Sequence, residues 1–184
     1  MIGAAFGATL ARAQTGDEAA FTQIFRDVQP ALLRYLRVVA PEAAEDVAGE
    51  TWLQVVTGLA GFQGEELAFR AWLFTITRHR AADWGRSRAR RPAIPMADPQ
   101  APDRLSAPDT ADVALERIAT RAALTAVAAL PRDQAEIVML RVVAGLDTNQ
   151  VAEIVGKSPG AVRVAAHRAL RRLAETTDRA GVTL

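Results

Sequence analysis

Five prolines stand between residues 92 and 108 and divide the chain into two parts. Proline fixes φ and has no backbone N–H, so a segment of this density forms neither a helix interior nor a central strand. Asp98 and Asp103 lie among these prolines, and such a composition is typical of an extended linker. A segment of this length spans up to about 60 Å when extended. We therefore expect two separate cores.

On both sides of this segment, apolar residues recur at the spacing of helices rather than of strands. A first helix is expected from Asp17, with further helices opening at Pro30 and at Pro41. A long helix is expected at about 68–88, and Pro131 opens another in the second part. The pattern predicts an all-α fold with two small helical domains, 14–91 and 112–177, joined by a linker at 92–111.

The composition excludes several classes of protein. The chain has no Cys, which excludes disulfides and thiolate metal sites, and only two His, which disfavours a His-built zinc site. No apolar stretch approaches the roughly 18–20 residues that cross a bilayer. The apolar start, residues 1–11, precedes rather than follows its first cation, Arg12, so we interpret it as a loose or partly helical tail and not as a secretory signal. We expect a cytoplasmic protein without metal or cofactor.

The formal net charge of +1 conceals a segmental distribution. Residues 1–77 carry 5 basic and 9 acidic side chains, whereas residues 78–91 carry 6 arginines and one aspartate. Residues 92–156 again carry 5 basic and 9 acidic side chains, and residues 157–184 carry 6 and 2. Two basic blocks in an acidic chain indicate a nucleic acid or another acidic partner.

The second basic block coincides with a predicted helix-turn-helix at residues 147–174. Asp147 is a suitable N-cap for the first helix, and Gly156 begins the turn. Ser158 and Pro159 then suit the start of a second helix, on which Val162, Ala166 and Leu170 are expected to point inward. A second helix that carries cations is the element such motifs place in the major groove. The alternative is an ordinary helical hairpin with a solvated arginine face.

The first basic block and the helix before it allow more than one interpretation. Arginines interleaved with Trp84, and preceded by Phe69, Trp72 and Phe74, suit unstacked bases of a single strand. Trp72 and Phe74 are equally compatible with a core, and arginines at a helix end also favour the helix dipole. Asp46, Glu50 and Gln54 recur every four residues, a stripe that is either a solvated face or a surface for a basic partner.

The order of these motifs resembles the extracytoplasmic-function (ECF) sigma factors of bacteria. The resemblance rests on AEDVAGETW, then FRAWLFTITRHRAADWGRSRARR, then the proline-rich linker, then LPRDQAEIVMLRVVAGLDTNQVAEIVGKSPGAVRVAAHRALRRLAE. It covers about residues 14–176 and implies a non-enzymatic promoter-specificity subunit with sigma regions two and four.

The resemblance implies three binding surfaces and three kinds of partner. The partners are core RNA polymerase, through its β′ clamp helices and β flap, promoter DNA, and an anti-sigma factor between the two domains. The residues implied for β′ docking are Asp46, Glu50 and Gln54. Those for the single-stranded minus-ten element are Phe62, Gln63, Phe69, Arg78, His79, Arg80, Asp83, Arg86 and Arg88. Those for the duplex minus-thirty-five element are Lys157, Ser158, Gly160, Ala161, Arg163, His167, Arg168 and Arg171.

Three departures from the family pattern matter. Gly49 replaces a common Gln on the docking helix, and Thr75 replaces a residue that is often basic. Val164-Ala165-Ala166 replaces a more polar run in the recognition helix, which leaves Arg163, His167 and Arg168 with more of the readout.

Two other functions remain open on the residues alone. A stand-alone helix-turn-helix regulator with an N-terminal effector domain explains residues 147–174 but not the first basic block or the linker. A hydrolase using His79 and Asp83 has a residue pair but no nucleophile or phosphate loop beside it.

Overall fold

In a computed structural model of the chain, the described backbone covers residues 1–90 and 111–179, and the described side chains cover 1–90 and 119–176. All regular structure in these ranges is helical, which confirms the predicted all-α fold. The predicted linker lies outside them, except that α5 begins at its last residue, Ala111. The main helices are α1 (Phe6–Gln14), α2 (Glu18–Val39), α3 (Ala44–Leu59), α4 (Glu66–Arg90), α5 (Ala111–Ala128), α6 (Arg132–Val138), α7 (Thr148–Val155) and α8 (Pro159–Arg179).

The helix α2 corrects the expectation that Pro30 begins a helix. Pro30 lies in the interior of one continuous helix that starts after the N-cap Asp17. The Asp17 carboxylate accepts the backbone N–H of Ala20, and this bond, together with the Arg12 guanidinium, lowers the pKa of Asp17. The apolar face runs unbroken past the proline, from Ile24 to Leu36. Tertiary packing of that face therefore outweighs the hydrogen bond that proline removes.

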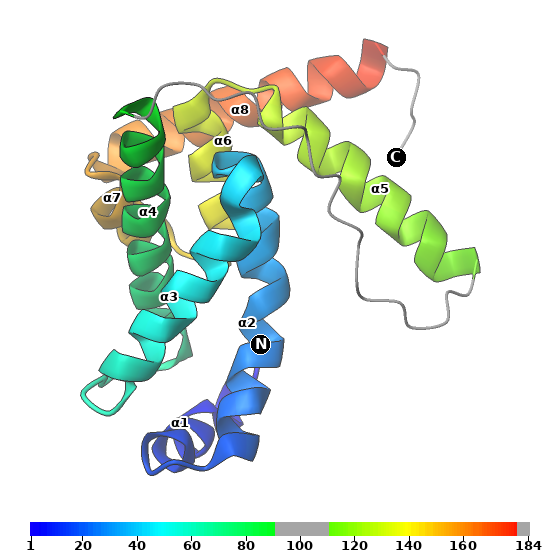
Figure 1. Ribbon diagram of the computed structural model, residues 1–184. Helices are drawn as coiled ribbons and strands as arrows, with labels where there is room; N and C mark the ends of the chain where they lie inside the picture. The colour runs from blue at the N-terminus through cyan, green and yellow to red at the C-terminus, as the bar shows by residue number, and fades with distance from the viewer. Residues whose placement is uncertain (91–110, 180–184) are drawn as a thin grey trace.

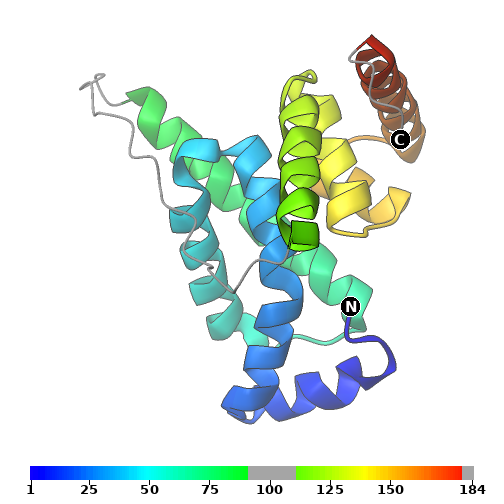
Figure 2. The same ribbon diagram turned by 90° about the vertical axis from the view of Figure 1, so that its right-hand side faces the viewer.

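The first domain packs α1, α3 and α4 around α2 (Figures 1 and 2). Its largest fully buried side chains come from α1, α2 and α4: Phe6, Ile24, Leu32, Tyr35, Leu36, Phe69, Leu73 and Phe74. A turn of 3₁₀ helix at Pro41–Ala43 leads into α3, as the sequence predicted for Pro41. This core fixes the outward faces of α3 and α4.

The helix α1 is packed rather than loose. Phe6 and Leu10 are 2% and 6% exposed, and the Phe6 ring lies 5.6 Å from that of Phe69. The buried Glu66 carboxylate accepts the backbone N–H groups of Ile2 and Gly3 at 3.0 and 2.7 Å. The folded unit thus begins before residue 14.

The second domain contains α6, which continues into a π-helical turn (Met139–Val143), and the pair α7 and α8. Ile137, Leu140, Leu146, Val151 and Val162 form its core, each at most 1% exposed. The inward positions on α8 are Val162 and Ala169, with Leu173 partly buried, whereas Leu170 is 55% exposed. The prediction that Leu170 points inward was wrong, because the helical period of 3.6 residues brings Ala169 to the core instead.

The two domains contact each other. The helix α6 and the π-helical turn pack on α2, and α7 packs on α4, which hides part of both first-domain helices (Figure 1).

Candidate nucleic-acid interface

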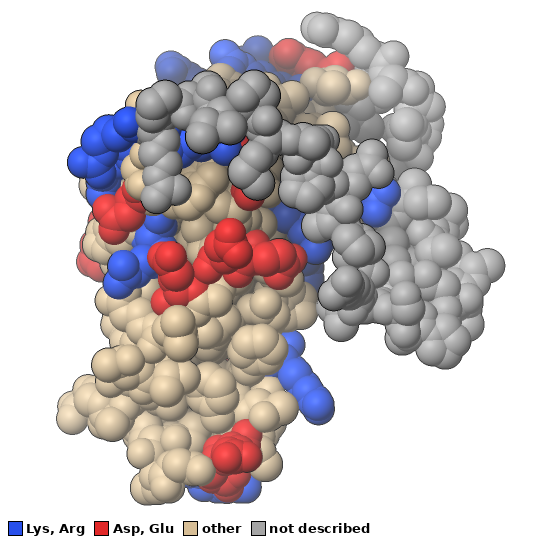
Figure 3. Space-filling view, in the orientation of Figure 1, with Lys and Arg blue, Asp and Glu red and all other residues tan. Residues whose placement is uncertain are grey.

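The predicted docking face on α3 exists as an exposed surface. Asp46, Glu50 and Gln54 are all exposed, because Val47, Thr51 and Val55 on the opposite side are buried. Glu42 and Glu45 add to the acidic patch, which appears red over α3 in Figure 3. Gln54 is already engaged, since its side-chain oxygen accepts Nε and Nη2 of Arg80 at 3.0 and 2.7 Å.

Two apolar residues on the same helix were not predicted as site residues. Leu53 is 72% exposed and Val56 is 56% exposed, next to the polar stripe. Their exposure could have been predicted from the sequence, because both lie outside the inward-facing series Val47, Thr51 and Val55. Exposed apolar side chains beside acidic ones are typical of an interaction surface.

The loop between α3 and α4 carries Gln63 and Phe62. Gln63 is exposed, and Phe62 is half-buried with its ring stacked on Trp72 at 5.0 Å between centroids. The Gln14 side chain donates to the carbonyls of Leu59 and Phe62 at 2.9 and 2.7 Å, which holds the loop against α1.

Phe69 does not belong to this surface. It is 0% exposed and packs edge-on against Phe62 at 5.5 Å. The expectation that Phe69 contacts a base was wrong for this conformation, because its position in the helix turns it into the core. Its role is to support the Phe62 ring.

The arginines predicted to contact the minus-ten element are present on α4, but each of them already holds a partner within the chain. Arg80 donates to Gln54, Arg86 pairs with Asp83, and Arg88 pairs with Glu42. The Arg88 guanidinium also lies 5.4 Å from the centre of the Trp84 ring. His79 and Asp83 are exposed on the same helix.

Arg78 contacts the second domain. Its Nε donates to Oε1 of Glu136 on α6 at 2.8 Å, and the same oxygen accepts the Tyr35 hydroxyl at 3.1 Å. Tyr35 is fully buried, and this burial and the neighbouring Glu136 raise the pKa of Tyr35 well above its ordinary value. Sequence reasoning did not find this contact. Glu136 is 58 positions from Arg78 and 101 positions from Tyr35 along the chain.

The helix-turn-helix is built as predicted. The Asp147 carboxylate accepts the backbone N–H of Gln150, and the Gln150 side-chain oxygen accepts the backbone N–H of Asp147. The two residues thus form a capping box at the start of α7. Gly156 ends α7 with φ of 66°, a left-handed conformation that favours glycine. The Ser158 hydroxyl accepts the backbone N–H of Ala161 at 3.2 Å and caps α8.

The outer face of α8 carries the predicted duplex-binding residues. All of them are exposed: Lys157, Ser158, Gly160, Ala161, Arg163, His167, Arg168 and Arg171. Lys157 pairs with Asp133 of α6 at 2.8 Å, and the hydrogen bond and charge of Lys157 lower the pKa of Asp133. The side chains of Arg163, His167 and Arg168 form no ion pair or hydrogen bond with another described residue.

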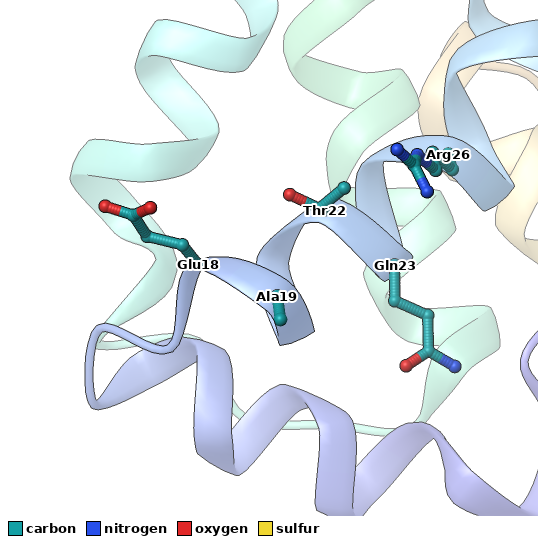
Figure 4. A pocket seen from close by; sticks show the side chains of 5 residues that line it. All are labelled: Glu18, Ala19, Thr22, Gln23 and Arg26. Atoms are coloured by element: carbon teal, nitrogen blue, oxygen red, sulfur yellow. The ribbon is translucent and has the colours of Figure 1, made fainter.

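The shallow hollows on the described surface include one on the first domain and one on the second. One is lined along α2 by Glu18, Ala19, Thr22, Gln23 and Arg26 (Figure 4), none of which was predicted as a site residue. The other lies between α6 and the start of α8, and its lining includes Lys157, Gly160, Ala161, Val164 and Arg168.

Three features of the described residues concern metal binding, hydrolysis and membrane insertion. Within them, no group of three or more His, Asp or Glu side chains is close enough to hold a metal ion. The Asp83 carboxylate is bound to Arg86, which leaves the hydrolase hypothesis without a paired His79 and Asp83. No described helix is long and apolar enough to cross a membrane.

Comparison with known proteins matches both halves of the chain to one family. Residues 24–91 match the model "Sigma-70 region 2", and residues 120–173 match "Sigma-70, region 4". The chain is 35% identical over 190 residues to the ECF RNA polymerase sigma factor SigD of Mycobacterium tuberculosis, covering 98% of this chain and 88% of SigD. It is 36% identical over 178 residues to the ECF sigma factor ShbA of Streptomyces griseus, covering 91% and 92%.

Solved structures agree with the sequence relatives. The sigma factor RpoE of Bartonella quintana, solved with the anti-sigma factor NepR, is 25% identical with a TM-score of 0.59, covering 84% of this chain and 94% of RpoE. CnrH, solved with the cytosolic domain of CnrY, shares the fold with a TM-score of 0.62 at 22% identity, covering 94% and 96%. The chain therefore belongs to the ECF family of RNA polymerase sigma factors.

Proposed function

We propose that this chain docks on core RNA polymerase through α3 and reads a two-element promoter. The loop before α4 and the outer face of α4 take the minus-ten element as a single strand, and α8 takes the minus-thirty-five element as duplex. The observation that carries this proposal is the capped α8, whose outer arginines lie exposed after a left-handed glycine turn.

The docking surface combines charge with apolar contact. Asp46 and Glu50 attract a basic helix pair, and Leu53 and Val56 supply exposed apolar area beside them. No side chain lies within 4 Å of where a Cβ on Gly49 would stand, so a partner helix can approach the α3 backbone closely there. Burial of the apolar pair contributes most of the affinity, and the carboxylates set the register.

The minus-ten surface captures unstacked bases. Gln63 is exposed in the same loop as Phe62, whose ring stacks on Trp72, and polar and aromatic groups close together in this way suit a flipped base. Stacking a base offsets an unstacking cost of a few kcal/mol. The phosphate backbone of the DNA strand passes along α4, beside His79, Arg80, Arg86 and Arg88. Phe69 supports the Phe62 and Trp72 rings from the core.

An anti-sigma factor is the third proposed partner. It is supported by the sigma factor RpoE, which was solved in complex with the anti-sigma factor NepR and shares 25% identity with this chain.

The docking proposal is tested with a charge-reversed variant. Asp46→Arg with Glu50→Arg should abolish co-purification with core polymerase, while the melting temperature stays unchanged, because both side chains are exposed. The matched control, Glu18→Arg with Glu153→Arg, makes the same charge change on exposed acids of α2 and α7 and should bind normally. Unchanged co-purification of the α3 variant would remove α3 as the docking surface.

A further inference from the structure

The first two turns of α8 carry an exposed apolar surface close to several basic side chains. Val164 is 51% exposed and lies beside Gly160 and Ala161 in the hollow between α6 and α8. Lys157 and Arg168 line the same hollow, together with Asp133 and Gln134 of α6. The side chains of Ala161 and Val164 have no hydrogen-bonding group, so they cannot read the donors and acceptors of a base pair.

Gly160 points to the same conclusion. It lies in the first turn of α8, and a Cβ built on it would meet only the Ser158 hydroxyl oxygen, at the ordinary distance of 4.0 Å. Nothing in the free chain thus requires glycine here, although glycine weakens a helix. The space above Gly160 is open to a ligand.

We propose that Val164 determines specificity by packing on the methyl group of a thymine in the major groove, with Gly160 leaving room for that base. The C5-methyl of thymine is the apolar feature that the major groove offers. Arg163 and Arg168 meet phosphates on either side of this contact. This inference rests on the proposed minus-thirty-five function of α8.

The test removes only the methyl group. A duplex is first selected from a pool randomised in the minus-thirty-five region, with holoenzyme built from the full chain. Each thymine of that duplex is then replaced by deoxyuridine. At one position this change should weaken binding about fourfold, the loss expected for one buried methyl group. Val164→Ala should not respond to that replacement, and Arg163→Ala should weaken binding to both duplexes equally.

Gly160→Ala separates a DNA-contacting role from a structural one. The variant should melt at a higher temperature and yet bind the selected duplex more weakly. Wild-type binding that is indifferent to deoxyuridine at every position would overturn the methyl contact alone. A pool from which nothing is enriched would overturn the proposed function and this contact together.

An independent observation concerns the contact between the two domains. Oε1 of Glu136 accepts both Arg78 and Tyr35, and its side chain is only 15% exposed. A second contact joins α7 to the start of α4, where Nε2 of Gln150 donates to the Leu67 carbonyl at 3.3 Å. Figure 1 shows α7 behind α4.

We infer that Glu136 holds the chain in a closed state that competes with promoter DNA. The Glu136 carboxylate takes the place at Arg78 that a phosphate of the minus-ten strand would occupy, so the two cannot be bound together. Separation of the two domains breaks the bonds of Glu136 with Arg78 and Tyr35. It also exposes Tyr35 and Glu136 to water, and hydrogen bonds with water then replace the bonds that were lost.

A reducible cross-link tests this closed state. The chain has no native cysteine. Leu67→Cys with Gln150→Cys, joined by a short reducible cross-linker, should lose run-off transcription with core polymerase and regain it on reduction. Single-cysteine variants given the same treatment should stay active. Equal transcription before and after reduction would overturn the inference.

Glu136→Gln provides a second measurement that does not depend on the cysteines. It should bind a minus-ten single strand several-fold more tightly than wild type, because it removes the negative charge that competes with a phosphate for Arg78. Glu175→Gln, which removes an exposed pair with Arg171, is the control and should bind as wild type does. An unchanged affinity of Glu136→Gln would count against the competition.

Discussion

The two arginine-rich surfaces of the molecule carry similar charge but differ in what their side chains already hold. Residues 78–91 have a net charge of +5 and residues 157–184 of +4. On α4, Arg78, Arg80, Arg86 and Arg88 each hold a partner within the chain. On α8, by contrast, only Arg171 and Arg172 of the described arginines hold partners, Glu175 and Gln134, whereas the side chains of Arg163 and Arg168 hold none among the described residues.

The number of arginines alone therefore does not describe how a surface can bind a nucleic acid. Under the proposed function, DNA binding at α8 would add new ion pairs and release counterions from the DNA. DNA binding at α4 would instead exchange internal pairs for phosphate contacts, so its net gain per arginine would be smaller. The exposed α4 pairs contribute little to folding stability, which leaves them free to exchange when bases are captured.

The largest effect that separates the two surfaces is expected on α8. Arg163→Ala with Arg168→Ala should weaken duplex binding by at least tenfold at low salt. The slope of log affinity against log salt should fall by about one for each arginine. Binding titrations at several salt concentrations measure both. Arg86→Ala with Arg88→Ala is the matched pair on α4, and its salt slope for a single strand should change less. Equal changes in the two slopes would erase the distinction.

A smaller effect follows from Lys157, a cation just before α8 that pairs with Asp133 of α6. Asp133→Asn releases Lys157 and removes a negative charge next to the DNA, so duplex affinity should rise a few-fold at low salt. Fluorescence anisotropy with a labelled duplex measures this rise, and Glu153→Gln on α7 is the control. Tighter binding by the control alone would show that Asp133 does not restrain Lys157.

The same pair has a predictable dependence on pH. Lys157 lowers the pKa of Asp133 in the folded chain, so their ion pair stabilises the fold above the unfolded pKa of about 3.9. That contribution is lost as the pH falls through the lower, folded pKa. Wild type should therefore exceed Asp133→Asn slightly in stability at pH 7, and the difference should vanish in acid. Denaturant melts at both pH values test this.

The smallest effect is expected from an exposed pair on α4. Glu42→Gln breaks the pair with Arg88, whose side chains are 55% and 61% exposed, and should change the free energy of unfolding by less than about 0.5 kcal/mol. A loss of several kcal/mol would mean that the α4 pairs stabilise the fold. Exchanging them for contacts with DNA phosphates would then be costly.

Local signals predicted the fold well wherever they were not opposed by packing. The caps at Asp147 and Ser158 and the turn at Gly156 all stand where the sequence placed them, since capping depends on neighbours along the chain. Pro30 misled the prediction because a buried apolar face outweighed its local preference. Leu170 was assigned to the wrong face, since four-residue spacing alone does not fix the phase of a helix within a core. Phe69 was named for base contact from composition and family resemblance, and neither reports the burial of a side chain.

The parts of the site that were not predicted depend on contacts between distant residues. The partners of Arg78 and Arg80 lie on other helices, and no pattern along the chain encodes them. Leu53 and Val56 could have been recognised, because both depart from the inward stripe of α3.

The most direct measurement is run-off transcription with purified core polymerase on a template that carries the selected promoter. The proposed function predicts a specific transcript that requires the full chain, fails with Asp46→Arg and Glu50→Arg, and weakens with Arg163→Ala. Specific binding of the chain alone to a duplex, without any association with core polymerase or any transcript, would contradict it.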